Sequence, residues 1–255
     1  MFAKERQDQI AALLKKSGAI TTSDLVARFA VSLETIRRDL LTMEQQGRLS
    51  RVHGGAVVRG DMKTYTELRV RNNEYAREKD ALARAAMQLV QEGDIIAIDA
   101  GSTAISFAEA LKEVFQKLTV ITHSLDVFER LRDHKEFTVL LCAGHYMRNE
   151  NAFYGALALN AMRCLHATKG FVFPGAVSLK YGICDFNQEL LQMQQQILES
   201  SDEIYVLADS SKFEKKSLLK LDDMKSNYCY VTDNGLPPEL RKLYAENGLR
   251  VITDA

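Results

Sequence analysis

From residue 77 onward, segments with helical periodicity alternate with short apolar runs, and this alternation limits the fold more than any other feature of the chain. Apolar residues recur at helical spacing over 82–90, and a continuous apolar run typical of a buried strand follows at 95–98. The same pattern predicts helices near 105–111, 125–131, 156–162 and 188–198, and strands at 118–121, 137–141, 170–173, 204–208, 228–232 and 249–252. Strands that are apolar throughout indicate a mostly parallel, Rossmann-like α/β sheet covered by helices.

The first 58 residues follow a different pattern, that of three short helices and a hairpin. The first helix is predicted over 4–16; Thr21 then begins the second helix, and Ser32 is a good N-cap for the third. Within the third helix one apolar stripe is predicted to be buried, formed by Leu33, Ile36, Leu40 and Met43. After it, residues 48–52 and 56–58 flank the turn His53-Gly54-Gly55 as a β-hairpin.

The charge is distributed unevenly between these parts. The first 60 residues carry ten basic and six acidic side chains, whereas the whole chain has a formal net charge of −1. A basic head on an acidic body is typical of a DNA-binding segment joined to a domain that does not bind DNA, although chance alone gives such a window about as often. No apolar run approaches the length of a membrane span, no signal peptide is evident, and four scattered cysteines fit a reduced cytoplasm.

The third helix has the composition of a helix that reads DNA. Opposite its apolar stripe, the first turns carry polar side chains that can reach base edges and phosphates in the major groove. The hairpin supplies further charges for the phosphate backbone. A solvated pair of arginines on an ordinary helix is the alternative, but the ordered series of cap, helix, turn, helix and basic hairpin favours DNA binding. The candidate DNA contacts are Thr21, Thr22, Ser32, Glu34, Thr35, Arg37, Arg38, Arg48, Arg51, His53, Gly54 and Gly55.

These residues also resemble a known family. The run from Ser32 to Leu40, followed by Glu44-Gln45-Gln46-Gly47-Arg48-Leu49 and by Arg51-Val52-His53-Gly54-Gly55-Ala56, is similar to the N-terminal signature of the DeoR family of bacterial sugar-metabolism regulators. The match is nearly continuous over residues 4–58. The resemblance implies a winged helix-turn-helix, and a protein that usually represses transcription until a sugar phosphate or related compound releases it.

In the larger segment, Asp99-Ala100-Gly101-Ser102-Thr103 lies where a strand ends and a helix begins. Free N–H groups at the helix start and two hydroxyls make this a ready anion site, although the same motif also serves as a generic helix cap. Loops after other strands converge on the same crevice in an open α/β sheet. They add Thr122, His123, Ser124, Gly144, Arg148 and Lys212, of which Lys212 is the charged partner expected for a phosphate.

These loops resemble the DeoR sensor domain, whose fold is akin to that of ribose-5-phosphate isomerases. The resemblance implies an effector site formed by Gly101, Ser102, Thr103, Ser124 and Lys212, with Asp99 and Glu189 as sugar contacts. The chain departs from the usual family pattern at four positions: His123 replaces Asn, Ala143 replaces the first Gly of a pair, Val177 replaces Asp, and Glu214 replaces Gly.

Parts of the sequence also fit other functions. A sugar-phosphate isomerase needs a general base and a group that polarises the carbonyl, and Glu189 and Lys212 are the nominal pair, but Val177 stands where related isomerases carry a carboxylate. Metal binding is suggested by Cys142 near His145 and by Cys164 near His166, without ligands to complete either set. A third interpretation is an interaction protein whose sensor no longer binds a ligand. The hydroxyl-rich loops argue against it.

We therefore predict an α/β protein with three segments: a winged helix-turn-helix domain at 1–58, a polar linker at 59–76, and a Rossmann-like sensor domain at 77–255. Its expected partners are a double-stranded DNA operator and a small phosphorylated metabolite such as a sugar phosphate. We expect a cytoplasmic repressor that is a homodimer or homotetramer, because two heads read two half-sites. We expect no enzyme activity, no metal, no cofactor and no membrane association.

Overall fold

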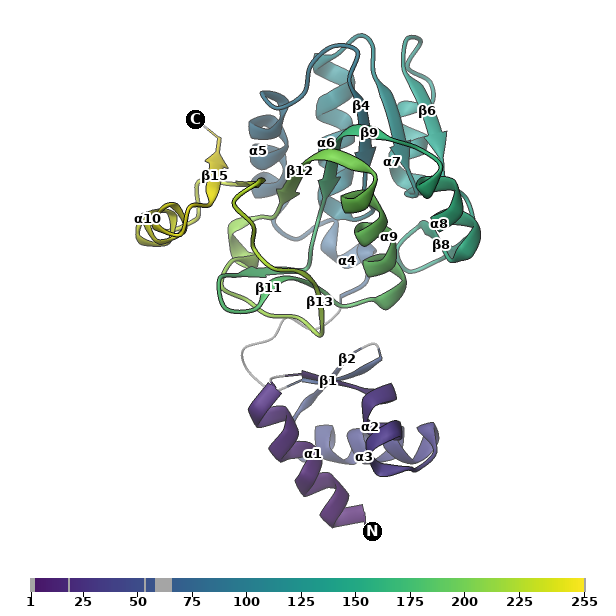
Figure 1. Ribbon diagram of the computed structural model, residues 1–255, viewed down its shortest axis with the longest axis vertical. Coiled ribbons are helices and arrows are strands. Elements are labelled where there is room, and N and C mark those ends of the chain that lie inside the picture. The colour runs from purple at the N-terminus through teal and green to yellow at the C-terminus, as the bar shows by residue number, and fades with distance from the viewer. Residues whose placement is uncertain (1–2, 18, 53, 58–65, 255) are drawn as a thin grey trace.

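The computed structural model describes residues 3–17, 19–52, 54–57 and 66–254, and Figure 1 shows how its elements are arranged. The N-terminal part has three helices, α1 (Ala3–Ser17), α2 (Thr22–Phe29) and α3 (Leu33–Gln45). Its three short strands are β1 (Ala19–Thr21), β2 (Ser50–Val52) and β3 (Gly55–Val57), which pair antiparallel in the order β1-β3-β2. The predicted hairpin is therefore present, and β1 extends it by a strand that the sequence did not predict.

Local signals in the sequence set the helix starts, and apolar residues form one small core. Thr21 Oγ1 accepts a hydrogen bond from the N–H of Asp24 at 3.1 Å, and Ser32 Oγ accepts one from Thr35 at 3.2 Å, so both predicted N-caps are confirmed. Leu33 was predicted to be buried, but 43% of it is exposed, because it is the first residue of α3 and lies at the end of the helix. The core consists of Ile10, Leu14, Leu25, Ile36, Leu40, Met43, Leu49 and Ala56.

A buried ion pair joins α1 to α3. Arg6 Nε lies 2.5 Å from Asp39 Oδ2, and Gln7 Nε2 donates to Asp39 Oδ1 at 3.0 Å. Asp39 is only 3% exposed, so protein donors replace water at both of its oxygens. The pair therefore holds α3 in a fixed orientation against α1.

The C-terminal part is built on a seven-stranded parallel sheet in the order β15-β14-β12-β9-β4-β5-β6, which confirms the predicted fold class. The chain enters at β4, adds β5 and β6 on one side, and then returns to place β9 on the other side of β4. The strand order thus reverses between β4 and β9. The strands are β4 (Ile95–Ile98), β5 (Thr119–Thr122), β6 (Thr138–Leu141), β9 (Ala167–Val172), β12 (Ser201–Leu207), β14 (Tyr228–Thr232) and β15 (Arg250–Thr253).

Helices cover both faces of this sheet (Figure 1), which is why its strands are apolar throughout. Along β4, Ile96 and Ile98 belong to one core cluster and Ala97 to the other, as the alternation of side chains in a strand requires. One cluster includes residues of α5 (Ala76–Met87), α6 (Ser102–Val114) and α7 (Leu125–Leu131). The other includes residues of α8 (Ala156–Arg163), α9 (Gln188–Glu199) and α10 (Pro238–Glu246).

The short antiparallel strands and the helix α10 were not predicted. The strands are too short to show a sustained alternation of apolar and polar residues in the sequence. A hairpin pairs β7 (His145–Met147) with β8 (Ala152–Tyr154). A separate sheet has the order β10-β11-β13, formed by β10 (Ala176–Ser178), β11 (Gly182–Asp185) and β13 (Leu219–Asp222). A single 3-10 turn, η1 (Ser210–Lys212), follows β12.

The segment predicted as a linker contains a helix in its second half. Helix α4 (Leu68–Arg71) packs on the C-terminal domain, where Leu68 is 4% exposed and its N–H donates to the carbonyl of Asn149 at 3.3 Å. Residues 58–65 lie outside the described part of the chain. Leu68 therefore anchors the second half of the predicted linker to the C-terminal domain.

Asp39→Ala should destabilise the N-terminal domain by about 3 kcal/mol, because it leaves the buried Arg6 charge without its partner. We expect amides of α1 and α3 to exchange with solvent more than about a hundredfold faster, measured by hydrogen exchange and mass spectrometry. Glu34→Ala, at an exposed position of the same helix, serves as the control. Unchanged protection of α3 in the Asp39 variant would show that the pair does not hold the helix.

Candidate functional site

The start of α3 presents charged side chains to solvent. Glu34, Arg37 and Arg38 are exposed, on the side of the helix opposite the buried Ile36 and Leu40. Ser32 and Thr35 have a different role, because their hydroxyls lie 2.8 Å apart and form the N-cap. The predicted polar face at the start of α3 is therefore exposed to solvent, with both of its arginines.

The hairpin that follows α3 carries arginines that already have acidic partners. Arg48 lies 2.7 Å from Asp8 of α1, and Arg51 lies 2.9 Å from Glu44 of α3. Both arginines were predicted to contact phosphates, and each must share its charge with a neighbouring carboxylate to do so. These pairs brace the hairpin against the helices. His53 lies outside the described residues.

The remaining candidates near the hairpin have structural roles. The backbone N–H and the hydroxyl of Thr22 both donate to the carbonyl of Gly54, at 2.7 and 3.0 Å, and Thr21 caps α2. Gly54 has φ +83°, a conformation that favours glycine. A Cβ on Gly55 would lie 2.3 Å from the carbonyl oxygen of Ile20, so Gly55 allows β3 to pack on β1. The prediction of Gly55 as a DNA contact is corrected accordingly, since it is buried within the small sheet.

In the C-terminal domain, the candidate effector residues gather where the strand order reverses. Asp99 follows β4, and Phe173 follows β9, the neighbouring strand on the other side. In an open α/β sheet this switch point forms the crevice where ligands bind. His123 and Ser124 follow β5, and Asp209 follows β12, so the loops meet at the same edge of the sheet, as predicted.

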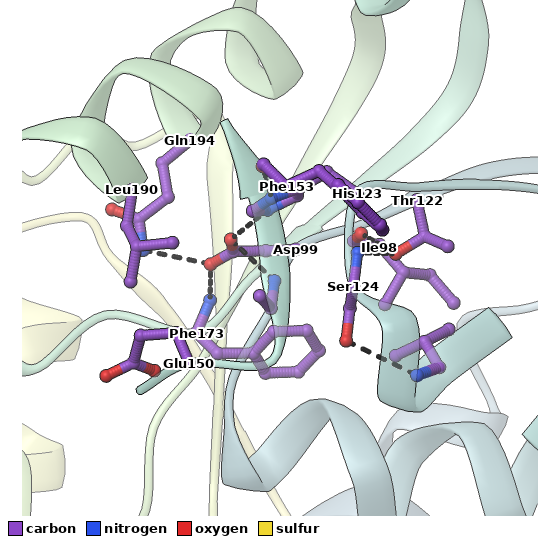
Figure 2. A network of polar contacts seen from close by, with 12 residues as sticks. Ile98, Asp99, Thr122, His123, Ser124, Glu150, Phe153, Phe173, Leu190 and Gln194 are labelled. Atoms are coloured by element: carbon purple, nitrogen blue, oxygen red, sulfur yellow. Dashed lines mark hydrogen bonds and ion pairs between the residues drawn. The ribbon is translucent and has the colours of Figure 1, made fainter. Parts of the chain in front are cut away.

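The carboxylate of Asp99 is the centre of this edge (Figure 2). Its Oδ1 accepts hydrogen bonds from the N–H of Ala100 at 2.7 Å and from His123 Nε2 at 3.0 Å. Its Oδ2 accepts from the N–H of Phe173 at 3.1 Å and from Gln194 Nε2 at 2.9 Å. Asp99 is fully buried. The carboxylate thereby ties β4, β5, β9 and α9 together.

Two predicted contacts are corrected by this network. Asp99 was expected to bind the sugar, but four protein donors already occupy its oxygens. His123 was a candidate effector contact, but its second ring nitrogen lies 2.9 Å from the carbonyl of Phe153, so both nitrogens are used within the fold. These two residues position the site rather than contact a ligand.

The other residues after β5 are also engaged. The hydroxyl of Thr122 donates to the carbonyl of Ile98 at 2.8 Å and accepts the N–H of Ser124 at 3.1 Å. Ser124 Oγ accepts the N–H of Val127 at 3.3 Å and caps α7. Thr122 and Ser124 are almost fully buried. They hold β5 and α7 in place beside the Asp99 network, and their hydroxyls are engaged with backbone groups of the fold.

The N-terminus of α6 retains the character of an anion site. Gly101 is the N-cap residue with φ +138°, and no side chain caps the helix there. Ser102 and Thr103 are 6% and 1% exposed. No donor or acceptor among the described residues reaches Thr103 Oγ1. Free N–H groups, the helix dipole and an unpaired buried hydroxyl together favour an anion at this point.

Three cations lie near this helix start. The Lys212 side chain is 13% exposed, and its Nζ lies 3.8 Å from Asp209. Burial lowers the pKa of Lys212, and the nearby charge of Arg71 lowers it further against the opposing effect of Asp209. Burial and the charge of Lys212 lower the pKa of Lys79 to about 8. Three basic groups this close disfavour one another's charge, so an anion between them would be stabilised.

The sequence did not identify Arg71 and Lys79 as site residues. Arg71 lies in α4, within the segment predicted to be a linker, where it pairs with the buried carboxylate of Glu150. Lys79, on α5, donates to the carbonyls of Arg71 and Glu74 and is 3% exposed. A lysine on the apolar side of a helix was the available signal, because such a residue is seldom buried without a partner.

A cavity next to these cations is lined by acidic and amide side chains. Asp185 and Gln194 contribute to it, and burial raises the pKa of Asp185. Neither residue was predicted from the sequence. Gln194 links Asp185 to the Asp99 network, with both contacts at 2.9 Å. The full lining is Thr66, Arg71, Ala100, Glu150, Phe173, Asp185, Phe186, Asn187, Leu190 and Gln194.

Three predicted effector residues lie away from this cavity. A Cβ on Gly144 would lie 2.5 Å from the carbonyl oxygen of Tyr154, so Gly144 allows close packing with β8. Arg148 is exposed in the turn after β7. Glu189, in the first turn of α9, lines a second cavity with Leu218 and Leu219. The structure therefore does not bring Gly144, Arg148 or Glu189 to the Asp99 edge.

The two Cys–His spacings that were considered as metal sites gain no further ligands among the described residues. Within the described ranges, no group of three His, Cys, Asp or Glu side chains is arranged to hold a metal ion. Cys142 is buried, which raises the pKa of its thiol to about 11, whereas Cys164 is exposed. No helix among the described residues is both long and apolar enough to span a membrane.

Asp99→Asn should weaken the edge of the sheet, because an amide group would present its own N–H to donors that need an acceptor. We expect the melting temperature of the C-terminal domain to fall by roughly 5–10 °C, which corresponds to about 2–4 kcal/mol. Differential scanning calorimetry measures this change. Asp133→Asn, at an exposed position, is the matched control and should melt as the wild type does. If both variants melt at the same temperature, the hydrogen bonds of Asp99 do not stabilise this edge of the sheet.

The chain matches two family models, the DeoR-like helix-turn-helix domain over residues 6–60 and the DeoR C-terminal sensor domain over residues 74–234. It is 31% identical to the HTH-type transcriptional regulator GolR of Listeria innocua, over 98% of each chain. It is also 31% identical to the lactose phosphotransferase system repressor of Lactococcus lactis, over 94% of each chain.

A solved structure of ribose 5-phosphate isomerase A from Neisseria gonorrhoeae is 19% identical, with a TM-score of 0.39, and the likeness covers 54% of this chain and 52% of that one. No function follows from a likeness of that extent. The two family models and the full-length relatives, by contrast, match both parts of the fold described above. The chain belongs to the DeoR family of DNA-binding transcriptional regulators.

Proposed function

We propose that this regulator is a repressor of a carbohydrate-utilisation operon and that a phosphorylated sugar or sugar alcohol releases it from its operator. The observation that carries the proposal is the group of three buried or half-buried cations, Arg71, Lys79 and Lys212, beside the uncapped start of α6. Among the relatives, the Lactococcus lactis protein is named a lactose phosphotransferase system repressor. One from Haemophilus influenzae, 27% identical over 95% of this chain, is named a glycerol-3-phosphate regulon repressor.

A phosphate group suits this site for electrostatic reasons. Burial lowers the pKa of both lysines, and a neighbouring cation lowers each further, Lys212 in the case of Lys79 and Arg71 in the case of Lys212, so a dianion beside them restores the charge that burial disfavours. The free N–H groups of α6 and the unpaired hydroxyl of Thr103 add neutral donors. The ligand stabilises the site most when it supplies at least one full negative charge, which a phosphate monoester does at neutral pH.

For DNA, we propose that the first turns of α3 enter the major groove. Arg37 and Arg38 have the length to reach guanine edges or phosphates, and neither forms an ion pair that the structure records among its described residues. The exposed Leu33 offers an apolar contact, such as to a thymine methyl group. Arg48 and Arg51 brace the hairpin and contribute secondary phosphate contacts.

We further propose that the chain is a regulator without enzyme activity, and that it acts in the cytoplasm as a homodimer or homotetramer. An isomerase would need Glu189 and Lys212 to face one substrate, but Glu189 lines a different cavity, with Leu218 and Leu219. Val177 is buried and apolar within β10, so it supplies no base. A multimer follows from the small surface that one helix-turn-helix buries on DNA.

Arg38→Ala should weaken binding to the specific operator by about tenfold or more, because it removes a base or phosphate contact. Gel-shift titration with DNA from upstream of its own gene measures the effect, at a fixed salt concentration. Arg132→Ala removes an exposed arginine of the C-terminal domain and should leave the affinity unchanged. Undiminished affinity in Arg38→Ala would contradict the assignment of α3.

Lys212→Met should leave operator binding intact and remove the response to the effector, since it deletes one of the three cations. In the same gel shift, a panel of sugar and sugar-alcohol phosphates is added one compound at a time. We expect one compound to release the wild-type complex and to need at least about a tenfold higher concentration with the variant. Lys215→Met, three residues further along and exposed, should respond as the wild type does. Normal release in Lys212→Met would exclude the phosphate site.

A further inference from the structure

Gln194, on α9, fixes the direction of its own side-chain carbonyl. Its Nε2 lies 2.9 Å from Asp99 Oδ2 and 2.9 Å from Asp185 Oδ2. Only the nitrogen of an amide can face two carboxylate oxygens, because the amide oxygen would be repelled by both. Chemistry therefore settles which atom is which, and Oε1 must point away from the two acids, as Figure 2 shows for Asp99.

The carbonyl oxygen fixed in this way is a buried acceptor without a donor. Gln194 is 1% exposed, and no donor of the described residues lies within hydrogen-bond distance of Oε1. A buried acceptor left unsatisfied costs stability, and native proteins contain few of them. The side chain of Gln194 lines the cavity beside Arg71 and Asp185. Gln194 is thus a residue of the cavity wall, and its buried oxygen lacks a donor among the described residues.

The walls of this cavity divide into two chemical kinds. Arg71 brings positive charge at one part of the lining, and the charges of Lys212 and Lys79 act close to it. Asp185, Gln194 and Glu150, which is the ion-pair partner of Arg71, bring oxygen acceptors to other parts of the lining. A ligand that matches both kinds has an anionic head and a tail with hydrogen-bond donors. Hydroxyl groups on a carbon chain are such donors and lie at a distance from the anionic head, whereas a P–OH of inorganic phosphate belongs to the head itself.

We propose that Gln194 determines the specificity of the effector site: its Oε1 accepts a hydrogen bond from a hydroxyl of the bound molecule. The effector is then a polyhydroxylated phosphate ester, and it is selected over inorganic phosphate by this contact. The inference rests on the proposed function, since it assumes that the phosphate binds at the cations. Sites built to hydrogen-bond a hydroxyl reject analogues that lack it, because the protein acceptor is then left unpaired.

The test compares the full-length protein with two variants by isothermal calorimetry. The probes are inorganic phosphate, glycerol 3-phosphate, sorbitol 6-phosphate and the 6-phosphates of glucose, galactose and fructose. We expect one ester to bind the wild type at least about tenfold more tightly than inorganic phosphate does. Gln194→Met should reduce that advantage to about threefold or less and change the affinity for inorganic phosphate by less than about twofold. Gln195→Met, the exposed neighbour on the same helix, should behave as the wild type does.

Each other outcome counts against the proposal. If Gln194→Met loses ester and inorganic phosphate affinity equally, Gln194 only positions Asp99 and Asp185. If the variant keeps the full advantage of the ester, a solvent molecule satisfies Oε1 and the residue selects nothing. If no probe binds the wild type, the proposed function fails and this inference fails with it. If inorganic phosphate binds as tightly as every ester, the proposed function stands and the role of Gln194 is excluded.

A second measurement covers the case in which Gln194→Met does not fold. The wild-type protein is titrated with the best ester and with each of its singly deoxygenated analogues. The proposal expects one hydroxyl whose removal weakens binding by about tenfold or more, because the Oε1 acceptor is then unpaired. Equal binding of all the analogues would overturn it.

Discussion

The arrangement of the sensor domain depends on the four hydrogen bonds that converge on the Asp99 carboxylate. They come from β5, from the residue after β9, from α9 and from the backbone beside Asp99 itself. β4 and β9 pair as neighbouring parallel strands, and the N–H of Asp99 donates to the carbonyl of Phe171, so the ladder continues up to the point where the strand order reverses. Beyond that point the Asp99 carboxylate supplies the acceptors for four donors. Because α6 begins three residues later, its orientation follows from the same contacts.

The same carboxylate explains why a histidine can stand at position 123. Its ring spans from Asp99 to the carbonyl of Phe153 and so links β5 to β8 as well as to β4. An asparagine, which the family usually has there, is shorter and reaches fewer partners. The histidine therefore braces this edge of the sheet through contacts within the fold.

The sequence could predict the sheet and the loops at its edge, because continuous apolar strands and parallel pairing bring those loops together whatever their side chains are. It could not show which polar side chains on the loops are used within the fold. Asp99 and His123 face each other, and nothing local distinguishes that from facing a ligand. Gln194 lies among Gln192, Gln195 and Gln196, and only its tertiary contacts separate it from them.

Glu214, another departure from the family pattern, also depends on contacts that are distant in the sequence. Glu214 adopts φ +52°, which explains why glycine is usual at that position. Its carboxylate accepts hydrogen bonds from Ser178, the N–H of Leu179 and the hydroxyl of Tyr244, and these contacts offset the strain of a left-handed residue. The strain and its compensation involve three separate segments, so a local reading of the sequence has no means of finding them.

The position of Arg71 suggests how occupation of the sensor reaches the DNA-binding domain. Arg71 lies in α4, the first described helix after the segment that joins the two domains, and its partner is the buried carboxylate of Glu150. Under the proposed function, a bound phosphate competes with Glu150 for this guanidinium. A ligand changes an equilibrium only by the difference in its affinity for the two states. Under the proposed function, the state in which Arg71 contacts the phosphate instead of Glu150 would be favoured on binding, which would couple the effector site to α4.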